Sequence, residues 1–418
     1  MNKKLSWRFF GALTAAVLVR VASASAQTVV VATGNPDIDV PAVQAAVDQG
    51  GEVILQGRFS FDRSPTVPTA TNWVGGLATV LVSKRVAISG TEDDDGAMTT
   101  IEGGTTPFYV EAPGAGVTIQ RLRFVRPKGD AIFVYAVSGL LIRFCKIEGV
   151  DLGLGFGAGI DIQTGNSIPA PAIPGKPENV SGRLLIVNND IEVGGTAQLS
   201  TVGVLIFSVG APAAEVEVHV SGNRIRNTSE PAINVRRAIG RVFVERNIIK
   251  TGSVFGTPNN IQAIRAANTG SFLIAHNKIE CEWGHPDAQG IGVFSQVAEW
   301  PMEGAIVTDN EVTMSPPEGV LFSNRSGGIT ISGFAQGNVV MANKIRGRGR
   351  AALSVTVFFA GGITADNTLA RNHVDDFDAS QADVFIGPGV TDTLVFEQKG
   401  TIEDQGMNTV IVPFKSRE

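Results

Sequence analysis

The stretch Val242-Phe-Val244-Glu-Arg-Asn247-Ile-Ile249 decides the fold, because its pattern of apolar residues around one asparagine recurs through most of the chain. The copies align on one column of central residues, each followed two positions later by another apolar residue. That column contains Leu122, Cys145, Asn189, Asn223, Asn247, Asn277, Asn310, Asn343 and Asn372. Successive copies lie 23 to 44 residues apart. Each copy is therefore one short supersecondary unit, which has to stack on its neighbours to bury a core.

A second pattern lies between the copies and consists of a small residue followed by apolar-x-apolar. Gly203-Val-Leu-Ile206 and Gly290-Ile-Gly-Val293 are two examples. Together the two patterns give three short strands in each unit. Successive side chains of a strand point to opposite faces, so the apolar residues of each coil fill a cylinder and the intervening residues face outward.

The asparagine column indicates a tight turn that recurs in register. Asparagine tolerates the left-handed backbone conformation that a sharp turn requires, and its amide can bond the backbone of the same turn or of the next coil. Stacked amides pair donors with acceptors along a ladder. Seven asparagines in one register are not explained by a general preference for loops.

With these features the chain resembles the right-handed parallel β-helix proteins of the pectin-lyase-like superfamily, from about Thr28 to the C-terminus. The resemblance implies an all-β fold, namely a single-stranded right-handed parallel β-helix with three strands per coil, an Asn ladder and an N-terminal capping helix. The segment from Asp39 to Leu55 is similar to that helix and the strand after it. Pro41 suits a first helical turn, and Gly50-Gly51 suits the helix end.

Val40, Val43 and Val47 form the apolar stripe of this expected helix. We therefore expect one β-helix domain over residues 27–418, with an N-terminal cap at 27–60 and a Pro-rich loop insertion at 150–182. One continuous solenoid suits a chain with 49 glycines and 43% hydrophobic residues.

Residues 1–26 are expected to be a secretory signal peptide. Lys3, Lys4 and Arg8 precede an apolar run that is too short to span a bilayer, and Ala24-Ser25-Ala26 suits signal cleavage. The mature chain would be secreted or periplasmic and would have no membrane span. An uncleaved anchor is the alternative.

The charge and the cysteines exclude some classes of function and structure. The formal charge is −6. Removal of the signal would take away four basic residues and leave the mature chain at −10, which argues against nucleic-acid binding. Cys145 and Cys281 lie four coils apart, roughly 19 Å along the axis, which is too far for a disulfide.

The histidines form no metal-binding spacing, so no cofactor is expected. Calcium at Asp93-Asp94-Asp95-Gly96 is an alternative to a solvated turn.

In the family that the chain resembles, catalysis usually occurs on the outward face of the first strand of each coil. Hydrolysis of a glycosidic bond needs two nearby carboxyl groups, and this face offers only Asp161. The paired Asp, Gly-His-Gly and Arg-Ile-Lys motifs of polygalacturonases are absent, as are the Arg- and Asp-rich calcium motifs of pectate lyases. Hydrolysis by a carboxylate pair is therefore not expected.

A lyase or epimerase would need only a base and a cation that neutralises a uronate carboxylate. We predict Arg236 and Arg265 as the cations, and His285 and Asp287 as the source of a titratable group. We predict that a sugar chain crosses an open floor at Gly292. The other predicted substrate-binding residues are Trp283, Trp300, Asn234 and Asp161. Alternatively, the tryptophans pack over the cylinder and the arginines bond loop carbonyls.

Two functions from different classes therefore remain open. The first is a secreted protein that binds or processes a polysaccharide or a cell-surface glycan, with lyase or epimerase chemistry if it is an enzyme. The second is a non-catalytic β-helix that serves as an adhesin or structural surface component. A β-helix fold is compatible with both.

Overall fold

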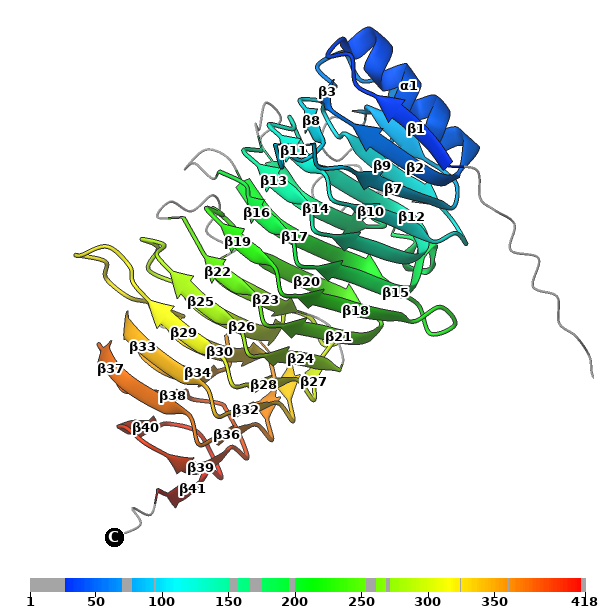
Figure 1. Ribbon diagram of the computed structural model, residues 1–418. Coiled ribbons are helices and arrows are strands. Elements are labelled where there is room, and N and C mark those ends of the chain that lie inside the picture. Colours follow the sequence, from blue (N-terminus) through cyan, green and yellow to red (C-terminus); the bar gives the residue numbers. More distant parts are fainter. Residues whose placement is uncertain are drawn as a thin grey trace, which may run out of the picture.

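The computed structural model describes residues 27–69, 77–93, 95–150, 156–165, 175–194, 200–252, 261–267, 271–323, 325–358 and 361–414. The chain winds as a right-handed parallel β-helix, and its coils stack in sequence order from one end of the molecule to the other (Figure 1). The predicted fold class is confirmed. The predicted signal at 1–26 lies outside the described residues.

Three families of parallel strands run along the solenoid. The first-strand family contains β6 (Val80–Val82), β9 (Phe108–Ala112), the first half of β12 (Ile132–Arg143), β14 (Phe156–Gln163), β17 (Ser200–Val209), β20 (Ile233–Ala238), β23 (Gln262–Ala267), β26 (Gln289–Ser295), β30 (Gly327–Gly333), β34 (Ala351–Thr356), β38 (Val384–Ile386) and β40 (Ile402–Asp404). This family forms the sheet that positions the candidate site.

The second-strand family continues each coil after a bend. It contains β1 (Gln27–Val31), β2 (Gly51–Gln56), β7 (Val86–Gly90), β10 (Val117–Gln120), the second half of β12, β15 (Val180–Val187), β18 (Val216–Ser221), β21 (Gly240–Glu245), β24 (Phe272–Ala275), β28 (Ile306–Thr308), β32 (Val339–Met341), β36 (Thr368–Ala370), β39 (Leu394–Gln398) and β41 (Val410–Pro413). Because β12 runs through the bend, it belongs to both families.

The third-strand family follows the asparagine turn. It contains β3 (Arg58–Ser60), β8 (Thr100–Glu102), β11 (Arg123–Val125), β13 (Lys146–Glu148), β16 (Asp190–Glu192), β19 (Arg224–Arg226), β22 (Ile248–Lys250), β25 (Lys278–Cys281), β29 (Glu311–Met314), β33 (Lys344–Gly349) and β37 (His373–Ala379). Shorter pieces are β27 (Met302–Glu303), β31 (Ala335–Gln336) and β35 (Thr364–Ala365), and the hairpin strands β4 (Val67–Pro68) and β5 (Leu77–Ala78).

The small residue that opens each first strand has a packing reason. A Cβ at Gly203 would lie 2.5 Å from Ile225 Cγ2, and a Cβ at Gly290 would lie 2.4 Å from Val312 Cγ1. Both positions therefore face the core, where the aliphatic residue of the third strand already fills the space. The small residue thus lets the first strand approach the third strand within one coil.

The predicted ladder is present at the turn between the second and third families. Asn247 Nδ2 donates to Asn277 Oδ1 at 2.9 Å and to the Val220 carbonyl at 2.8 Å. Asn247 Oδ1 in turn accepts from the Asn223 side chain at 3.0 Å. The left-handed conformation, however, falls one residue earlier than expected, as at Arg246 with φ 55°. Asparagine is needed here for its buried amide, and the preceding residue makes the sharp bend.

A second, shorter ladder was not predicted. Asn338 Nδ2 donates to Asn367 Oδ1 at 2.9 Å, and Asn338 Oδ1 accepts from the Ala305 backbone N–H at 2.9 Å. It lies at the bend before β32 and β36, where the last coils carry the extra strands β27, β31 and β35. Two members in a row are too few to appear as a column in the sequence.

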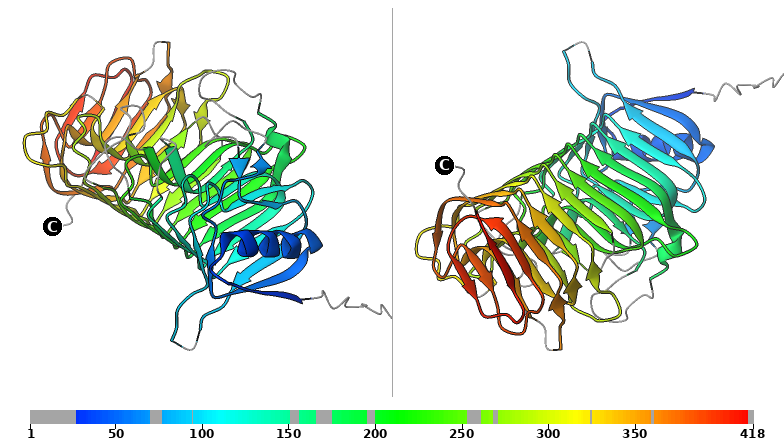
Figure 2. Two further views of the ribbon diagram at one scale, coloured as in Figure 1. Left: turned by 90° about the horizontal axis from the view of Figure 1, so that it is seen from above. Right: turned by 90° about the horizontal axis from the view of Figure 1, so that it is seen from below.

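The expected cap is present, with a corrected start. Helix α1 (Pro36–Gln49) covers the N-terminal end of the solenoid, and the C-terminus lies at the opposite end (Figures 1 and 2). Asn35 caps the helix and Pro36 occupies its first turn, so Pro41 lies inside the helix and not at its start. The Asp39 carboxylate accepts from the backbone N–H groups of Gly34 and Ser60, which ties the helix to the first coil.

Both cysteines are buried and unpaired, as the coil separation predicted. Burial raises the pKa of each thiol to about 12. The stripe of Val40, Val43 and Val47 is buried against the first coils. Within the expected insertion at 150–182, residues 156–163 form strand β14, and residues 177–179 form a 3-10 turn that leads into β15.

Candidate functional site

The outward residues of the first-strand family form continuous rows across the coils. One row runs Asp161, Leu205, Asn234, Arg265, Gly292, Thr330 and Ser354. The next row runs Gln163, Phe207, Arg236, Ala267, Phe294, Ser332 and Thr356. These pairings are those that the sequence periodicity predicted, so the register of the candidate face is confirmed.

Three arginines gather on two adjacent coils of this face. The Arg236 and Arg237 guanidinium carbons lie 5.1 and 5.6 Å from the centre of the Phe207 ring. The Arg265 guanidinium carbon lies 4.9 Å from the centre of the Phe294 ring. Each guanidinium thus rests on an aromatic side chain of the neighbouring strand, at a distance typical of cation–π contacts.

The electrostatics of this Arg cluster, namely Arg236, Arg237 and Arg265, are set by burial and mutual repulsion. Burial, and then the neighbouring Arg236, lower the pKa of Arg265 to about 9, while Glu230 acts in the opposite direction. Burial and Arg237 lower the pKa of Arg236 to about 10. Arg236 and Arg265 still carry a positive charge at neutral pH. Arg236 Nε and Arg237 Nε are buried, and neither donates a hydrogen bond to a described residue.

The open floor predicted at Gly292 is not present. A Cβ at Gly292 would lie 2.3 Å from Gln262 Cγ and 2.8 Å from Gln289 Oε1. Two glutamine side chains therefore fill the space above this glycine. Gly292 is needed because these side chains lie across the strand, so a sugar chain cannot rest on it.

The two tryptophans do not flank a groove. Trp283 is fully buried, and its indole N–H donates to the Thr228 carbonyl at 3.0 Å. It therefore has no free face for a sugar ring and belongs to the core, contrary to its predicted role. Trp300 is half-buried in the turn after β26, and it is not among the residues that line the pocket described below.

Asp161 and Asn234 are also buried on this face. The Asp161 carboxylate accepts from Gln163 Nε2 at 2.8 Å and is fully shielded from solvent. Asn234 lies between Leu205 and Arg265 in its row and is 4% exposed. The structure therefore places these two residues beneath the surface.

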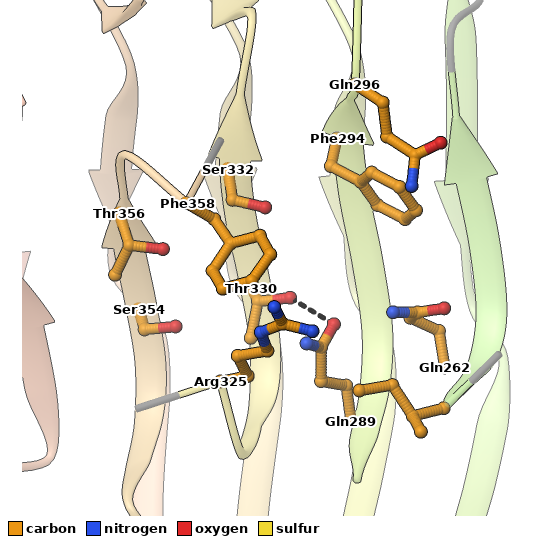
Figure 3. A pocket seen from close by; sticks show the side chains of 11 residues that line it. Gln262, Gln289, Phe294, Gln296, Arg325, Thr330, Ser332, Ser354, Thr356 and Phe358 are labelled. Carbon is orange, nitrogen blue, oxygen red and sulfur yellow. Dashed lines mark hydrogen bonds between the residues drawn. The ribbon is translucent and has the colours of Figure 1, made fainter. Parts of the chain in front are cut away.

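An open pocket lies next to the Arg cluster, over β23, β26, β30 and β34 (Figure 3). Its walls surround about 620 Å³, part of which is open to solvent. The lining residues are Ile261, Gln262, Gln289, Phe294, Gln296, Arg325, Thr330, Ser332, Ser354, Thr356 and Phe358. Amides and hydroxyls dominate this lining, two phenylalanines provide aromatic faces, and Arg325 is the only charged residue among its described members.

Contacts within and behind the pocket hold Arg325 in place. Its guanidinium carbon lies 3.2 Å from the centre of the Phe358 ring (Figure 3). Its Nη1 lies 3.8 Å from Asp287 Oδ2, and Asp287 Oδ1 accepts a hydrogen bond from the Ser323 hydroxyl. On the pocket floor, Thr330 Oγ1 donates to Gln289 Oε1 at 2.6 Å. Arg325 is thus oriented from behind while it faces the open space.

His285 belongs to the loop that carries Asp287. Its Nδ1 accepts from the Asp287 backbone N–H at 3.0 Å. Burial lowers the pKa of His285; Asp287 raises it, and Arg325 lowers it further. The structure therefore brings His285 and Asp287 together with Arg325, and not with Arg236 and Arg265 as predicted.

Arg325 and the pocket were missed by the sequence argument. Arg325 lies in a loop before β30, so strand periodicity does not place it on any face. A signal was available in the strands themselves, since Thr330, Ser332, Ser354 and Thr356 are outward hydroxyl residues at matching positions of two successive coils.

The described residues contain no group of three His, Cys, Asp or Glu side chains that could hold a metal ion. The Asp93 carboxylate accepts from the backbone N–H groups of Asp95 and Ala97, which caps its own turn. None of the helices among the described residues is long and apolar enough to cross a membrane.

No family model and no curated protein matches the sequence. The structure is similar to that of DFA-IIIase from Arthrobacter chlorophenolicus A6 in complex with GF2, at 12% identity over 91% of this chain and 93% of that chain, with a TM-score of 0.46. It is similar to the Dettilon tailspike protein at 14% identity over 91% and 68% of the two chains, with a TM-score of 0.45.

A third similar structure is the A-module of the mannuronan C-5 epimerase AlgE4 from Azotobacter vinelandii, at 13% identity over 91% of this chain and 98% of that chain, with a TM-score of 0.37. At these identities and TM-scores the similarity concerns only the winding of the chain. The function has to be argued from the chemistry of the site itself.

Proposed function

We propose that this protein binds an acidic polysaccharide along the outward face of its first-strand sheet, with the Arg325 pocket as the principal subsite. The observation that carries the proposal is the lining of that pocket. Amide and hydroxyl groups converge on an open space that also contains two aromatic rings and one oriented guanidinium. A sugar acid has the matching chemistry, namely several hydroxyl groups, an apolar ring face and a carboxylate.

The distribution of cations supports a polymer over a single sugar. Three partly exposed arginines of this face each lie over a phenylalanine ring, namely Arg236 over Phe207, Arg325 over Phe358 and Arg350 over Phe385, whereas Arg265 is buried. From β20 to β34 this arrangement covers five coils, or roughly 19 Å along the axis. A chain that carries repeated carboxylates can place several of them near these cations.

Binding is favoured over hydrolysis by what the pocket contains. Its described lining has no Asp, Glu or His side chain, and Asp161 is buried elsewhere on the face. A glycosidase needs two carboxyl groups on either side of the scissile bond. This pocket therefore recognises a sugar without providing that pair.

A lyase or epimerase activity is the second candidate, and His285 favours it. Because burial lowers its pKa, the imidazole is neutral at neutral pH and able to accept a proton. It lies in the loop of Asp287, which contacts the pocket cation Arg325. Release of unsaturated uronate products, followed by ultraviolet absorbance, tests the lyase activity. An epimerase forms no unsaturated product, so uptake of deuterium from D2O at C5 of the polymer tests that activity.

The binding proposal is tested by affinity electrophoresis against polyuronates and neutral polysaccharides at two salt concentrations. We expect retention by the acidic polymers only, and weaker retention at high salt because exposed charge pairs are screened. Arg325→Gln should lower the affinity roughly tenfold or more, since a charge-assisted hydrogen bond is lost.

Arg371→Gln is the matched control. Arg371 also lies over a phenylalanine, Phe396, at 5.3 Å, but at the turn between the second and third families. Its substitution should leave retention unchanged. Equal loss in both variants, or equal retention of neutral polymers, would reject the proposed site and favour a surface or adhesin role without sugar recognition.

We further propose that the protein acts outside the cytoplasm, where such polymers occur. The support is the predicted signal at residues 1–26. N-terminal sequencing of the exported protein should give a chain that begins at Gln27. A chain that retains Met1 in the cell extract would contradict this.

A further inference from the structure

The outward face of the second-strand family carries an apolar stripe that the sugar-binding proposal does not use. Its clearest part, which we call the second-strand stripe, consists of Phe243, Leu273, Ile306, Val339, Leu394 and Val410. These residues are partners in the sheet, coil after coil, with Thr368 between Val339 and Leu394. Beyond His219, which pairs with Phe243, Leu185 and Leu141 continue the same row towards the N-terminal end.

The stripe faces away from the core. Its neighbours in each strand, such as Val307 beside Ile306 and Val395 beside Leu394, are fully buried. By contrast Ile306 is 42% exposed and Leu394 is 36% exposed. A contiguous apolar surface of this kind marks an interaction site far more often than scattered exposed residues do.

We propose that the second-strand stripe is a self-association surface, on which a second copy of this chain packs face to face and antiparallel. In each copy the side chains of successive strands are spaced about 4.8 Å apart, so the side chains of two copies can pack in register along the whole stripe. Ten strands give a length of roughly 43 Å. With a width near 15 Å, each copy would bury about 600 Å², which falls within the range of specific interfaces.

The charges beside the stripe select the antiparallel arrangement. Arg183 and Arg241 flank its N-terminal half, and both contact Glu217. These three side chains together carry one net positive charge. Asp366 and Asp392 lie exposed at the same edge of the C-terminal half, in the turns before β36 and β39. Neither forms an ion pair with another described residue.

We place the twofold axis parallel to the strands, between β24 and β28. This axis keeps the strand direction, so the same edge of the stripe faces itself in the two copies, and it reverses the order of the coils. It therefore places β15 of one copy over β39 of the other, and Arg183 opposite Asp392. Glu217 of β18 then lies opposite Asp366 of β36, but the two arginines that contact Glu217 keep this edge positive overall. A twofold axis along the coil axis would instead swap the two edges of the stripe, so Arg183 would no longer face Asp392. The twofold pairing is self-complementary, as closed homodimers require.

Sedimentation equilibrium of the full chain, with and without stripe variants, tests this inference. The wild type should form a dimer at micromolar concentration, and Ile306→Lys should shift it to monomer. Leu394→Lys, on a different coil, serves as a second variant in case the first does not fold. Leu321→Lys changes a loop leucine that is 85% exposed, and should leave the dimer intact.

A charge exchange tests the proposed register. Arg183→Glu and Asp392→Lys should each weaken dimerisation roughly tenfold or more, and the double variant should restore much of it, because opposite charges again face each other. A monomeric wild type, or a dimer insensitive to Ile306→Lys and Leu394→Lys, would overturn the inference. Failure of the charge exchange to restore the dimer would overturn the antiparallel register.

Discussion

Asn247 shows how one side chain joins several coils. Its amide N–H groups donate to Asn277 and to the Val220 carbonyl, and its Oδ1 accepts from both the side chain and the backbone of Asn223. No other side chain of this size offers donors and an acceptor in that arrangement. The ladder therefore depends on the amide, and replacement by a residue of similar volume should not preserve it.

Asn247→Asp should destabilise the fold by roughly 1–3 kcal/mol or more, because a carboxylate cannot donate to either acceptor oxygen. Asn188→Asp is the control, since Asn188 is exposed in the equivalent turn two coils away and makes the left-handed bend itself. Urea melts of both variants measure the difference. Equal stability of the two variants would contradict the assigned ladder.

Asp130 is a buried acid that makes stability depend on pH. Burial raises its pKa to about 8, against 3.8 ordinarily, while a hydrogen bond from the Ala158 backbone N–H acts in the opposite direction. Between these two values the folded state holds a proton that the unfolded chain has released. The contribution of Asp130 to stability is therefore largest below about pH 4 and is lost as the pH rises towards 8.

Asp130→Asn should remove the loss of folding stability that Asp130 causes as the pH rises towards 8. The amide oxygen can still accept from Ala158, and no buried charge forms at high pH. At pH 9 the variant should be more stable than the wild type by at least roughly 1–3 kcal/mol, and the difference should shrink at pH 4. Asp48→Asn, at an exposed position of α1, should show no such pH dependence in the same melts.

At the scale of the element, the first strands depend on their small opening residue. Gly203→Ala would place a Cβ 2.5 Å from both Ile225 Cγ2 and the Ala232 carbonyl oxygen. We expect a loss of roughly 1–3 kcal/mol from overpacking. Gly116→Ala is the control, because the nearest atoms to its added Cβ are 3.9 Å away. A similar small effect of both substitutions in thermal melts would refute this account of the motif.

The strand pattern was predictable because its period of two is strict over many coils. The outward rows through Asn234 and Arg265 follow from that period alone. The loops do not share this regularity, which is why Arg325 and Phe358 could not be placed. Trp283 was misplaced for the same reason: it follows β25 and turns into the core, where Thr228 accepts its indole N–H.

The predicted start of the capping helix and the predicted position of the left-handed turn residue both differ from the structure. The helix begins at Pro36, before the predicted start, and the left-handed residue lies one position before the asparagine. A proline is compatible with several sites in a helix start, and the Asn35 cap with Pro36 is a stronger signal than Pro41. The left-handed residue precedes the ladder asparagine, as at His276 with φ 57°. Histidine, arginine and aspartate occupy that bend, so composition does not reveal it.

At the scale of the whole molecule, the solenoid separates two surfaces. The first-strand face carries the Arg cluster and the Arg325 pocket, and the second-strand face carries the apolar stripe. Because the two faces belong to different strand families of the same coils, the proposed dimer leaves the proposed sugar site open. A dimer would then present two sugar-binding faces that run in opposite directions, and two segments of one polymer could bind them with a gain in avidity.

Hydroxyl-radical footprinting of the protein with and without a bound polyuronate tests the sugar-binding proposal most directly, at a fixed protein concentration. Phe358 lines the pocket, whereas Phe243 and Phe396 belong to the second-strand family. We predict that the polymer slows the oxidation of Phe358 and leaves that of Phe243 and Phe396 unchanged. A bound polymer that protects Phe243 or Phe396 and leaves Phe358 unprotected would contradict the proposed site.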